Sequence, residues 1–222
     1  MTIAKIKTVN IFSYKFIFFI MMLILACDSS DTVEEIDLSQ WELPFKEGNV
    51  WLYKAKYIKD EYFENLEQNA DERPVLVEDT IKIILRKVIA IDPIKDFYFN
   101  HDLNRRWWKD LILNKYEGYQ NYYSETNNYL LKYPIKLGHK WKNKIMEGFE
   151  VYEYTNLDTT ITTCGIKYSN CIELTMKFGY NYWPESDSGI VKIYLNEKYG
   201  LIYYYDPLLE EEYKLLKFEE YR

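Results

Sequence analysis

Short segments rich in tyrosine, tryptophan, valine and isoleucine follow one another along most of this 222-residue chain. Such residues favour strands, and the segments mostly have the length of strands rather than of helices. The segments are residues 50–58, 76–90, 96–100, 105–108, 118–123, 128–133, 141–146, 150–155, 172–178, 191–195, 200–205 and 212–218. Turn signals such as Asp92-Pro93 separate them. The chain is therefore predicted to be all-β, as an antiparallel sandwich or as a strongly curved sheet or half-barrel.

The composition narrows the classes of function. The chain has 23 Tyr, 11 Phe and 6 Trp but only two His and three Cys, so it offers little catalytic material. Its formal net charge of −7 argues against nucleic-acid binding. His101 and His139 lie in no catalytic motif, no phosphate loop or nucleophile motif is present, and no metal site or cofactor is expected. An enzyme is not predicted, and a hydrolase built from paired carboxylates is the minor alternative.

One motif occurs twice. Residues 44–51 and 134–141 share the pattern Pro, apolar, Lys, any residue, Gly, two residues, Trp. The proline cannot donate to a strand ladder, the glycine supplies a turn with positive φ, and the tryptophan opens the next strand as a large core residue. Both halves of the chain are predicted to use this turn. A duplicated meander, with halves 43–132 and 133–222 in one domain of residues 41–222, is the further hypothesis.

At these motifs the chain resembles a largely uncharacterised set of bacterial lipoproteins of the Bacteroidota type. Those proteins open their domain with Pro-x-x-x-Gly-x-x-Trp-x-Tyr, repeat a Pro/Gly/Trp element midway, and continue with a Gly-x-(Phe/Tyr)-x-x-Cys element. The matching residues here are Pro44, Gly48, Trp51, Tyr53, Gly165, Tyr168 and Cys171, with one extra residue between Gly165 and Tyr168. The resemblance implies an all-β fold and an envelope location, but no reaction.

The N-terminus predicts export and lipidation. Three lysines precede an apolar run over residues 16–26, which is too short to span a bilayer as a helix. The run ends in Ile24-Leu25-Ala26-Cys27, which resembles the lipobox of bacterial lipoproteins. This resemblance implies removal of residues 1–26 as a signal peptide, attachment of a diacylglycerol and an acyl chain such as palmitate to Cys27, and membrane anchoring through these chains. An ordinary cleaved signal and an uncleaved anchor helix are the alternatives.

Residues 27–40 are predicted to form the lipidated cysteine and an acidic tether. Residues 28–37 hold five acidic side chains and no basic one. Acidic residues behind a lipidated cysteine resemble the signals that send Bacteroidota lipoproteins to the outer face of the outer membrane. The predicted location is therefore the cell envelope, at the outer membrane and facing the periplasm or the surface. The alternative is the inner membrane, because Asp28 resembles the retention signal of enteric bacteria.

Cys164 and Cys171 are the candidates for a disulfide. Six residues separate them, an even number that can place them opposite one another across a hairpin containing residues 165–168. Outside the cytoplasm such a pair would oxidise. Two free thiols are the alternative.

Clusters of aromatic residues supply the candidate ligand contacts. Neighbouring residues of a strand point to opposite faces, so a cluster cannot lie wholly in one core. Outward Tyr and Trp side chains can stack on sugar rings, hold a peptide or line a groove for acyl chains. The candidate contact residues are Trp107, Trp108, Tyr122, Tyr123, Tyr182, Trp183 and Tyr204. A thick aromatic core is the alternative.

Together these features predict a lipid-anchored envelope lipoprotein with a non-enzymatic binding or structural domain. Its partners would be the membrane and a glycan, protein or lipid ligand. The alternative function is a lipid or lipoprotein carrier or chaperone with an apolar β-cavity. A deep apolar pocket would favour the carrier, and an outward row of aromatic side chains would favour the binding module.

Overall fold

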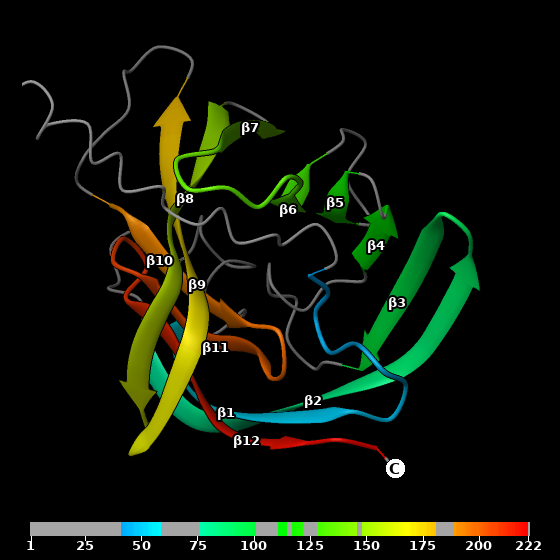
Figure 1. Cartoon of the computed structure of the whole chain (residues 1–222). Coiled ribbons are helices and arrows are strands. Elements are labelled where there is room, and N and C mark those ends of the chain that lie inside the picture. The colour runs from blue at the N-terminus through cyan, green and yellow to red at the C-terminus, as the bar shows by residue number, and fades with distance from the viewer. Residues whose placement is uncertain are drawn as a thin grey trace, which may run out of the picture. The chain divides into compact units, whose positions relative to one another are not determined.

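Strands and turns, with no helix, make up the described residues of this chain. The computed structural model describes residues 41–58, 76–100, 111–114, 117–121, 128–145, 148–180 and 189–221. All of them belong to the unit Asp37–Arg222, one of two units into which the chain divides. The strands are β1 (Val50–Ile58), β2 (Leu76–Ile91), β3 (Ile94–Asn100), β4 (Leu111–Asn114), β5 (Gly118–Asn121), β6 (Tyr129–Lys132), β7 (Lys140–Ile145), β8 (Gly148–Thr163), β9 (Ile166–Tyr180), β10 (Val191–Asn196), β11 (Gly200–Asp206) and β12 (Glu211–Glu219) (Figure 1).

The twelve strands of the described residues form one antiparallel sheet. Its order is β6-β5-β4-β3-β2-β1-β12-β11-β10-β9-β8-β7. Strands β1 to β6 and strands β7 to β12 are thus two meanders, joined where β1 pairs with β12. Figure 1 shows the sheet curling around its own interior. The all-β prediction is confirmed, and of its two architectures the strongly curved sheet is correct while the sandwich of two sheets is not.

Side chains link the two strands at the ends of this order, β6 and β7. The Asn143 side chain of β7 accepts a hydrogen bond from the backbone N–H of Tyr129 in β6 (3.0 Å) and donates one to the Tyr129 carbonyl oxygen (2.8 Å). The indole N–H of Trp141 donates to the same oxygen at 2.9 Å. Asn143 is 3% exposed. Its side-chain amide therefore satisfies the buried backbone N–H and carbonyl group of Tyr129, as the backbone of a paired strand would do.

Large aromatic side chains fill the inside of the curved sheet. The largest of them, Trp51, Tyr53, Tyr119, Tyr152 and Tyr154, are each at most 1% exposed. Where such a residue carries a polar group, the group is bonded: the Tyr53 hydroxyl, for example, donates to a carbonyl oxygen of β11 at 2.8 Å. Burial of rings of this size contributes a large share of the hydrophobic free energy of folding. The interior is therefore a packed core.

The segment before β1 packs into the same core. Phe45 lies edge-on to four rings, at centroid separations of 5.1 Å to Phe97, 5.2 Å to Phe99, 5.8 Å to Tyr119 and 5.9 Å to Trp51. Edge-to-face pairs at these distances are favourable for aromatic rings. Residues 41–49 are thus part of the packed structure.

The first Pro/Gly/Trp motif forms a turn closed by three hydrogen bonds. The backbone N–H of Asn49 donates to the carbonyl oxygen of Lys46 (3.0 Å), and its side chain donates to that of Pro44 (2.8 Å). The N–H of Gly48 donates across to Leu85 in β2 at 2.8 Å. Gly48 has a φ of 89°, a conformation that glycine adopts without strain.

The second motif forms the same turn. The backbone N–H of His139 donates to the carbonyl oxygen of Lys136 (3.0 Å), and its ring Nδ1 lies 2.6 Å from that of Pro134. The N–H of Gly138, whose φ is 75°, donates across to Tyr154 in β8 at 2.8 Å. Both motifs therefore attach the strand that they open to the strand that follows it. His139 consequently has a role in the turn.

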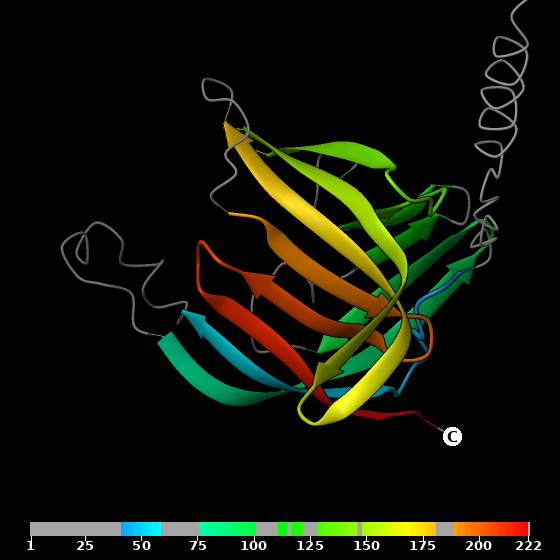
Figure 2. The ribbon, with the colours of Figure 1, turned by 60° about the vertical axis from the view of Figure 1, so that its left-hand side comes forward.

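The hairpin of β8 and β9 is bent over the sheet. Its pairing shifts register three times between Tyr154 and Ile161, and such bulges bend a strand pair. Asn170 has a φ of 55°, and the side chain of Asn196 donates to the carbonyl oxygens of Ser169 (2.9 Å) and Asn170 (3.3 Å). As a result β8 contacts β12, which is not its neighbour in the sheet. Figure 2 shows the far end of the hairpin passing across β12.

Candidate functional site

A groove lies between the far end of this hairpin and the outer face of the sheet. It has a volume of about 900 Å³. Strands β1, β10, β11 and β12 supply its floor, and residues 161–164 of the hairpin supply a wall. Three lysines and three tyrosines dominate the floor, namely Lys54, Lys192, Lys214, Tyr194, Tyr203 and Tyr205. The groove is thus both aromatic and cationic.

Strand pairing sets these side chains in two rows across the outer face. In the first row Tyr194 of β10 pairs with Tyr203 of β11, and their ring centroids are 5.9 Å apart. Tyr203 pairs in turn with Lys214 of β12, and Lys214 pairs with Lys54 of β1. Directly paired residues on one face of a sheet lie within contact distance, so the row is a continuous surface.

The second row lies two residues along the same strands. Lys192 of β10 pairs with Tyr205 of β11, and Tyr205 pairs with Glu212 of β12. Glu212 pairs with Lys56 of β1, which lies beyond the groove and contacts Glu210 at 3.4 Å. The first row thus runs from two tyrosines to two lysines, whereas in the second row a tyrosine and a glutamate lie between two lysines.

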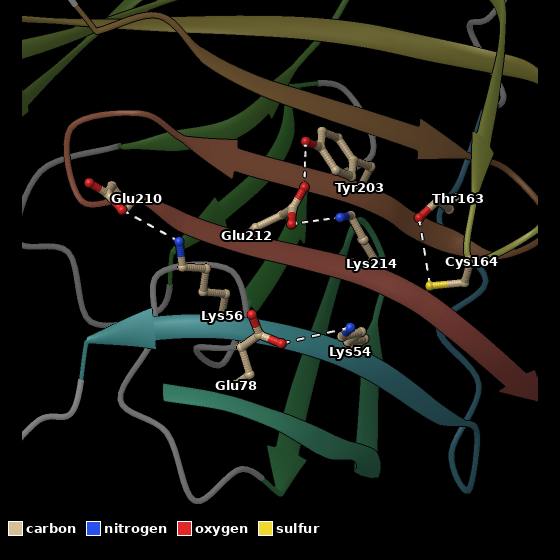
Figure 3. A network of polar contacts seen from close by, with 9 residues as sticks. All are labelled: Lys54, Lys56, Glu78, Thr163, Cys164, Tyr203, Glu210, Glu212 and Lys214. Carbon is tan, nitrogen blue, oxygen red and sulfur yellow. Dashed lines mark hydrogen bonds and ion pairs between the residues drawn. The ribbon is translucent and has the colours of Figure 1, made fainter. Parts of the chain in front are cut away.

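A carboxylate joins the two rows. Glu212 accepts a hydrogen bond from the Tyr203 hydroxyl (2.9 Å) with one oxygen and contacts the Lys214 ammonium (2.7 Å) with the other (Figure 3). Lys54 contacts Glu78 at 3.7 Å, but both side chains are more than half exposed, so this ion pair is weak. Within the described part of the chain no hydrogen bond or ion pair engages Lys192. Two of the three groove lysines thus have charge available for a ligand.

Two tyrosines of the floor, Tyr194 and Tyr203, stay protonated. Burial raises the pKa of Tyr203 well above its ordinary value, and the hydrogen bond to Glu212 raises it further. Burial and the neighbouring Glu173 raise the pKa of Tyr194 in the same direction. A phenol with a raised pKa is a hydrogen-bond donor and not a base at physiological pH. These hydroxyls are therefore suited to binding rather than to acid–base catalysis.

The predicted disulfide is not formed, and Cys164 and Cys171 are free thiols in this structure. The expected register was wrong. The hairpin turns at Cys164 and Gly165 themselves, with φ values of 49° and 77°, and Cys171 pairs with Thr159. Cys164 is exposed on the groove wall, whereas Cys171 is fully buried and burial raises the pKa of its thiol. Of these two cysteines, Cys164 is the one accessible to a reagent in the folded protein.

Most aromatic residues predicted as ligand contacts lie outside the described residues, namely Trp107, Trp108, Tyr122, Tyr123, Tyr182 and Trp183. Tyr204 is described, and its prediction needs correction. It is 3% exposed and packs in the core against Tyr213, with ring centroids 5.7 Å apart. The alternation of a strand instead directs its neighbours Tyr203 and Tyr205 into the groove.

The described residues contain no group of three or more His, Cys, Asp and Glu side chains placed to hold a metal ion. Among the same residues, no helix has the length and apolarity needed to cross a membrane. Cys27, the predicted signal peptide, the tether and His101 all lie outside the described residues.

No family model matches this chain, and no curated protein does. Two solved structures resemble it weakly. A protein of Bacteroides fragilis, described as exported and as having a YmcC-like fold, is 9% identical over 81% of this chain and 99% of that chain, with a TM-score of 0.37. A protein of Parabacteroides distasonis, described as a lipoprotein, is 10% identical over 80% of this chain and 97% of that chain, with a TM-score of 0.38. At such values the function must be inferred from this chain's own residues.

The sequence did not single out the lysines of the groove. Lys54, Lys192 and Lys214 occupy outward positions of three strands, a pattern that any solvent-facing strand can show. They form a set only when the pairing of β10, β11, β12 and β1 is known. Residues 161–164 were missed as well, because their threonine-rich run was not predicted as a strand. The one usable signal was the Tyr203-Tyr204-Tyr205 cluster.

Proposed function

We propose that this protein is a lipid-anchored lipoprotein of the cell envelope that acts as a non-enzymatic binding module. The groove on the outer face of the sheet is its ligand site. The observation that carries this proposal is the continuous surface of tyrosine and lysine side chains on the groove floor. Half-buried aromatic rings beside charged groups are typical of recognition surfaces.

The packing of the interior favours a binding module over a carrier. A carrier for an acyl chain needs an apolar cavity. The side chains that would line such a cavity, including Trp51, Tyr53, Tyr152 and Tyr154, are at most 1% exposed and belong to one packed core. Tyr194 and the two groove tyrosines of β11 lie on the opposite face. The described residues therefore place the accessible aromatic surface outside the sheet.

The proposed lipid anchor is inferred from the sequence. Residues 1–26 would be removed, Cys27 would carry the lipid, and residues 27–40 would link it to the sheet. Acyl chains contribute about 0.8 kcal/mol per buried methylene group, so two or three chains hold a protein firmly. At about 3.3 Å per residue, the acidic residues 28–37 extend up to about 30 Å. The proposed location is the outer membrane. If Asp28 acts as a retention signal, the protein would instead stay at the inner membrane.

Replacing Cys27 with alanine is expected to abolish lipidation. Cells would be labelled with palmitate, and the intact mass of the extracted protein would be measured. The wild-type mass should correspond to residues 27–222 plus a diacylglycerol and an acyl chain, whereas Cys27→Ala should carry no label. Cys164→Ala is the matched control and should keep both label and mass shift. An unlabelled wild-type protein that starts at Met1 would contradict the anchor.

Occupancy of the groove is expected to protect Cys164 from a maleimide reagent. The full chain, in a neutral detergent, would be treated with maleimide in the presence of polysaccharide extracted from the envelope of the source cells. Trypsin cuts after Lys167, so mass spectrometry separates the peptide of Cys164 from that of Cys171. The extract should slow labelling of Cys164 several-fold in the wild type, because a bound ligand covers the wall.

Two variants make this measurement specific. Tyr203→Ala should remove most of the protection, because it removes the central ring of the floor. Leu208→Ala changes a side chain that is 54% exposed and does not line the groove, so it should leave the protection unchanged. A rate of Cys164 labelling that no amount of extract alters would show that the groove is not the ligand site.

A further inference from the structure

We infer that the ligand of the groove is an acidic polysaccharide, a chain of sugar rings that carries carboxylate groups. This inference rests on the proposed function, because it names the class of ligand that the same groove takes. Three observations support this inference: the charge of the groove, the spacing of its tyrosines and the position of Glu212.

The groove is positively charged although the protein is acidic. Lys54, Lys192 and Lys214 line it against a single carboxylate, that of Glu212, among the described residues. The whole chain has a net charge of −7, which becomes −10 when the three lysines of residues 1–26 are removed. Glu212 already neutralises Lys214, and the exposed ion pair of Lys54 with Glu78 is weak, so the available positive charge lies on Lys54 and Lys192. A local excess of positive charge on an acidic protein selects an anionic ligand.

The two available lysines lie on either side of the two tyrosines of β11. Lys192 belongs to β10 and Lys54 to β1, so three strand spacings separate them, or about 14 Å across the sheet. Tyr203 and Tyr205 of β11 lie between these strands, and the ring of Tyr194 on β10 is 5.9 Å from that of Tyr203. The C–H faces of sugar rings stack on such aromatic surfaces. A run of a few sugar rings therefore covers the tyrosines while its carboxylates reach both lysines.

The carboxylate of Glu212 separates this ligand from other polyanions. It lies in the middle of the floor, between Tyr203 and Lys214 (Figure 3). Each repeat of a DNA strand offers a phosphate and no free hydroxyl, and a phosphate above Glu212 would be repelled. A sugar ring presents hydroxyl groups there, which can donate to the carboxylate oxygens. Glu212 thus favours a chain whose charges alternate with hydroxyls.

The place of the groove argues against an extended peptide. Peptides that bind to a sheet as an added strand pair with the backbone of its edge. The groove instead lies on the face of four consecutive strands, β10, β11, β12 and β1, whose backbone groups pair with one another. Recognition must therefore come from side chains. The exposed hydroxyl of Thr162 on the wall adds to the groups that can bond to sugar hydroxyls.

Calorimetric titration of the full chain in neutral detergent tests this inference. The probes are polygalacturonate and the same polymer after chemical reduction of its carboxyl groups to alcohols. Polygalacturonate should bind, and the reduced polymer should bind at least about tenfold more weakly, because it cannot form charge-assisted hydrogen bonds with the lysines. Lys54→Gln and Lys192→Gln should each weaken binding about tenfold for the same reason.

Lys56→Gln is the matched control. Lys56 lies on the same strand as Lys54, also faces outward, and contacts Glu210, but it does not line the groove. This variant should bind polygalacturonate as the wild type does. All variants change exposed or half-exposed lysines, so they should fold, and circular dichroism checks that they do.

The outcomes separate this inference from the proposed function. Equal binding of the reduced polymer, or of oligothymidylate or polyglutamate, would overturn the assignment of an acidic polysaccharide. Protection of Cys164 by the envelope extract would in that case still support the proposed function. If neither polygalacturonate binds nor the extract protects Cys164, both are wrong. Binding of polygalacturonate that Lys54→Gln and Lys192→Gln leave unchanged would likewise overturn the inference.

Discussion

Replacing Trp51 with alanine is expected to lower the free energy of unfolding by about 4 kcal/mol, within the range for a fully buried aromatic residue. The side chain is 0% exposed, and its ring lies 5.4 Å from Phe218, 5.9 Å from Phe45 and 6.2 Å from Phe99. Its indole N–H donates to the carbonyl oxygen of Tyr199 at 2.9 Å. Alanine would leave a cavity between rigid rings and remove the partner of that carbonyl group. Urea denaturation followed by far-ultraviolet circular dichroism measures the change.

The second copy of the motif offers a matched test. Trp141 is 5% exposed, stacks on Tyr152 at 5.2 Å and donates to the carbonyl oxygen of Tyr129 at 2.9 Å. Trp141→Ala should therefore cost a similar free energy. Leu208→Ala, at an exposed position, should change stability by no more than about 0.5 kcal/mol. A loss below about 1 kcal/mol for Trp51→Ala would contradict the close packing of the interior.

The two tryptophans occupy equivalent places in the two meanders. Each opens the first of six strands, β1 or β7, and each follows a turn with the same set of hydrogen bonds. The meanders meet through a backbone ladder at β1 and β12, but through the side chains of Asn143 and Trp141 at β6 and β7. Duplication of halves 43–132 and 133–222 stays a prediction, which the matching turns support.

The strands could be predicted because their local pattern is strong. Residues 50–58 were predicted as a strand and form β1, and the predictions for β10 and β11 differ from the structure by one residue at the C-terminal end. The segment Leu111–Asn114 was missed because it is a short run without a turn signal of its own, yet it forms β4. The second half of β8 was missed because its exposed threonines and asparagine do not show an apolar alternation.

The groove could not be predicted because it depends on contacts between segments that are distant in the chain. Its floor requires β1 to pair with β12, across more than 150 residues. Its wall requires the bulges that bend β8 and β9, and a one-residue change of register reverses the face of every later side chain. The same dependence explains why the spacing of Cys164 and Cys171 misled the prediction of a disulfide. Spacing predicts which residues share a strand face, and only register decides which residues meet.

Replacing Gly118 with alanine is expected to destabilise the protein by about 3 kcal/mol or more, because both the backbone conformation and the space around it exclude a side chain. Gly118 is the first residue of β5 and has a φ of 115°, where residues with a side chain are strained. A Cβ atom there would overlap the carbonyl oxygen of Leu131 and lie 3.0 Å from the Cα of Lys132. Both atoms belong to the backbone of β6, which cannot turn aside as a side chain can. Urea denaturation measures the loss.

Gly165→Ala separates the two causes of this loss. Gly165 also has a positive φ, 77°, but a Cβ atom there would meet nothing within 4 Å. This variant should therefore cost only the conformational strain, about 1 kcal/mol. The difference in stability loss between the two variants measures the clash with β6. Because the Asn143 side chain links β6 to β7, Gly118→Ala should also weaken the contact between these two strands. Faster hydrogen exchange at the Tyr129 N–H would report it. Equal losses for the two glycines would show that β5 and β6 do not approach as closely as the structure places them.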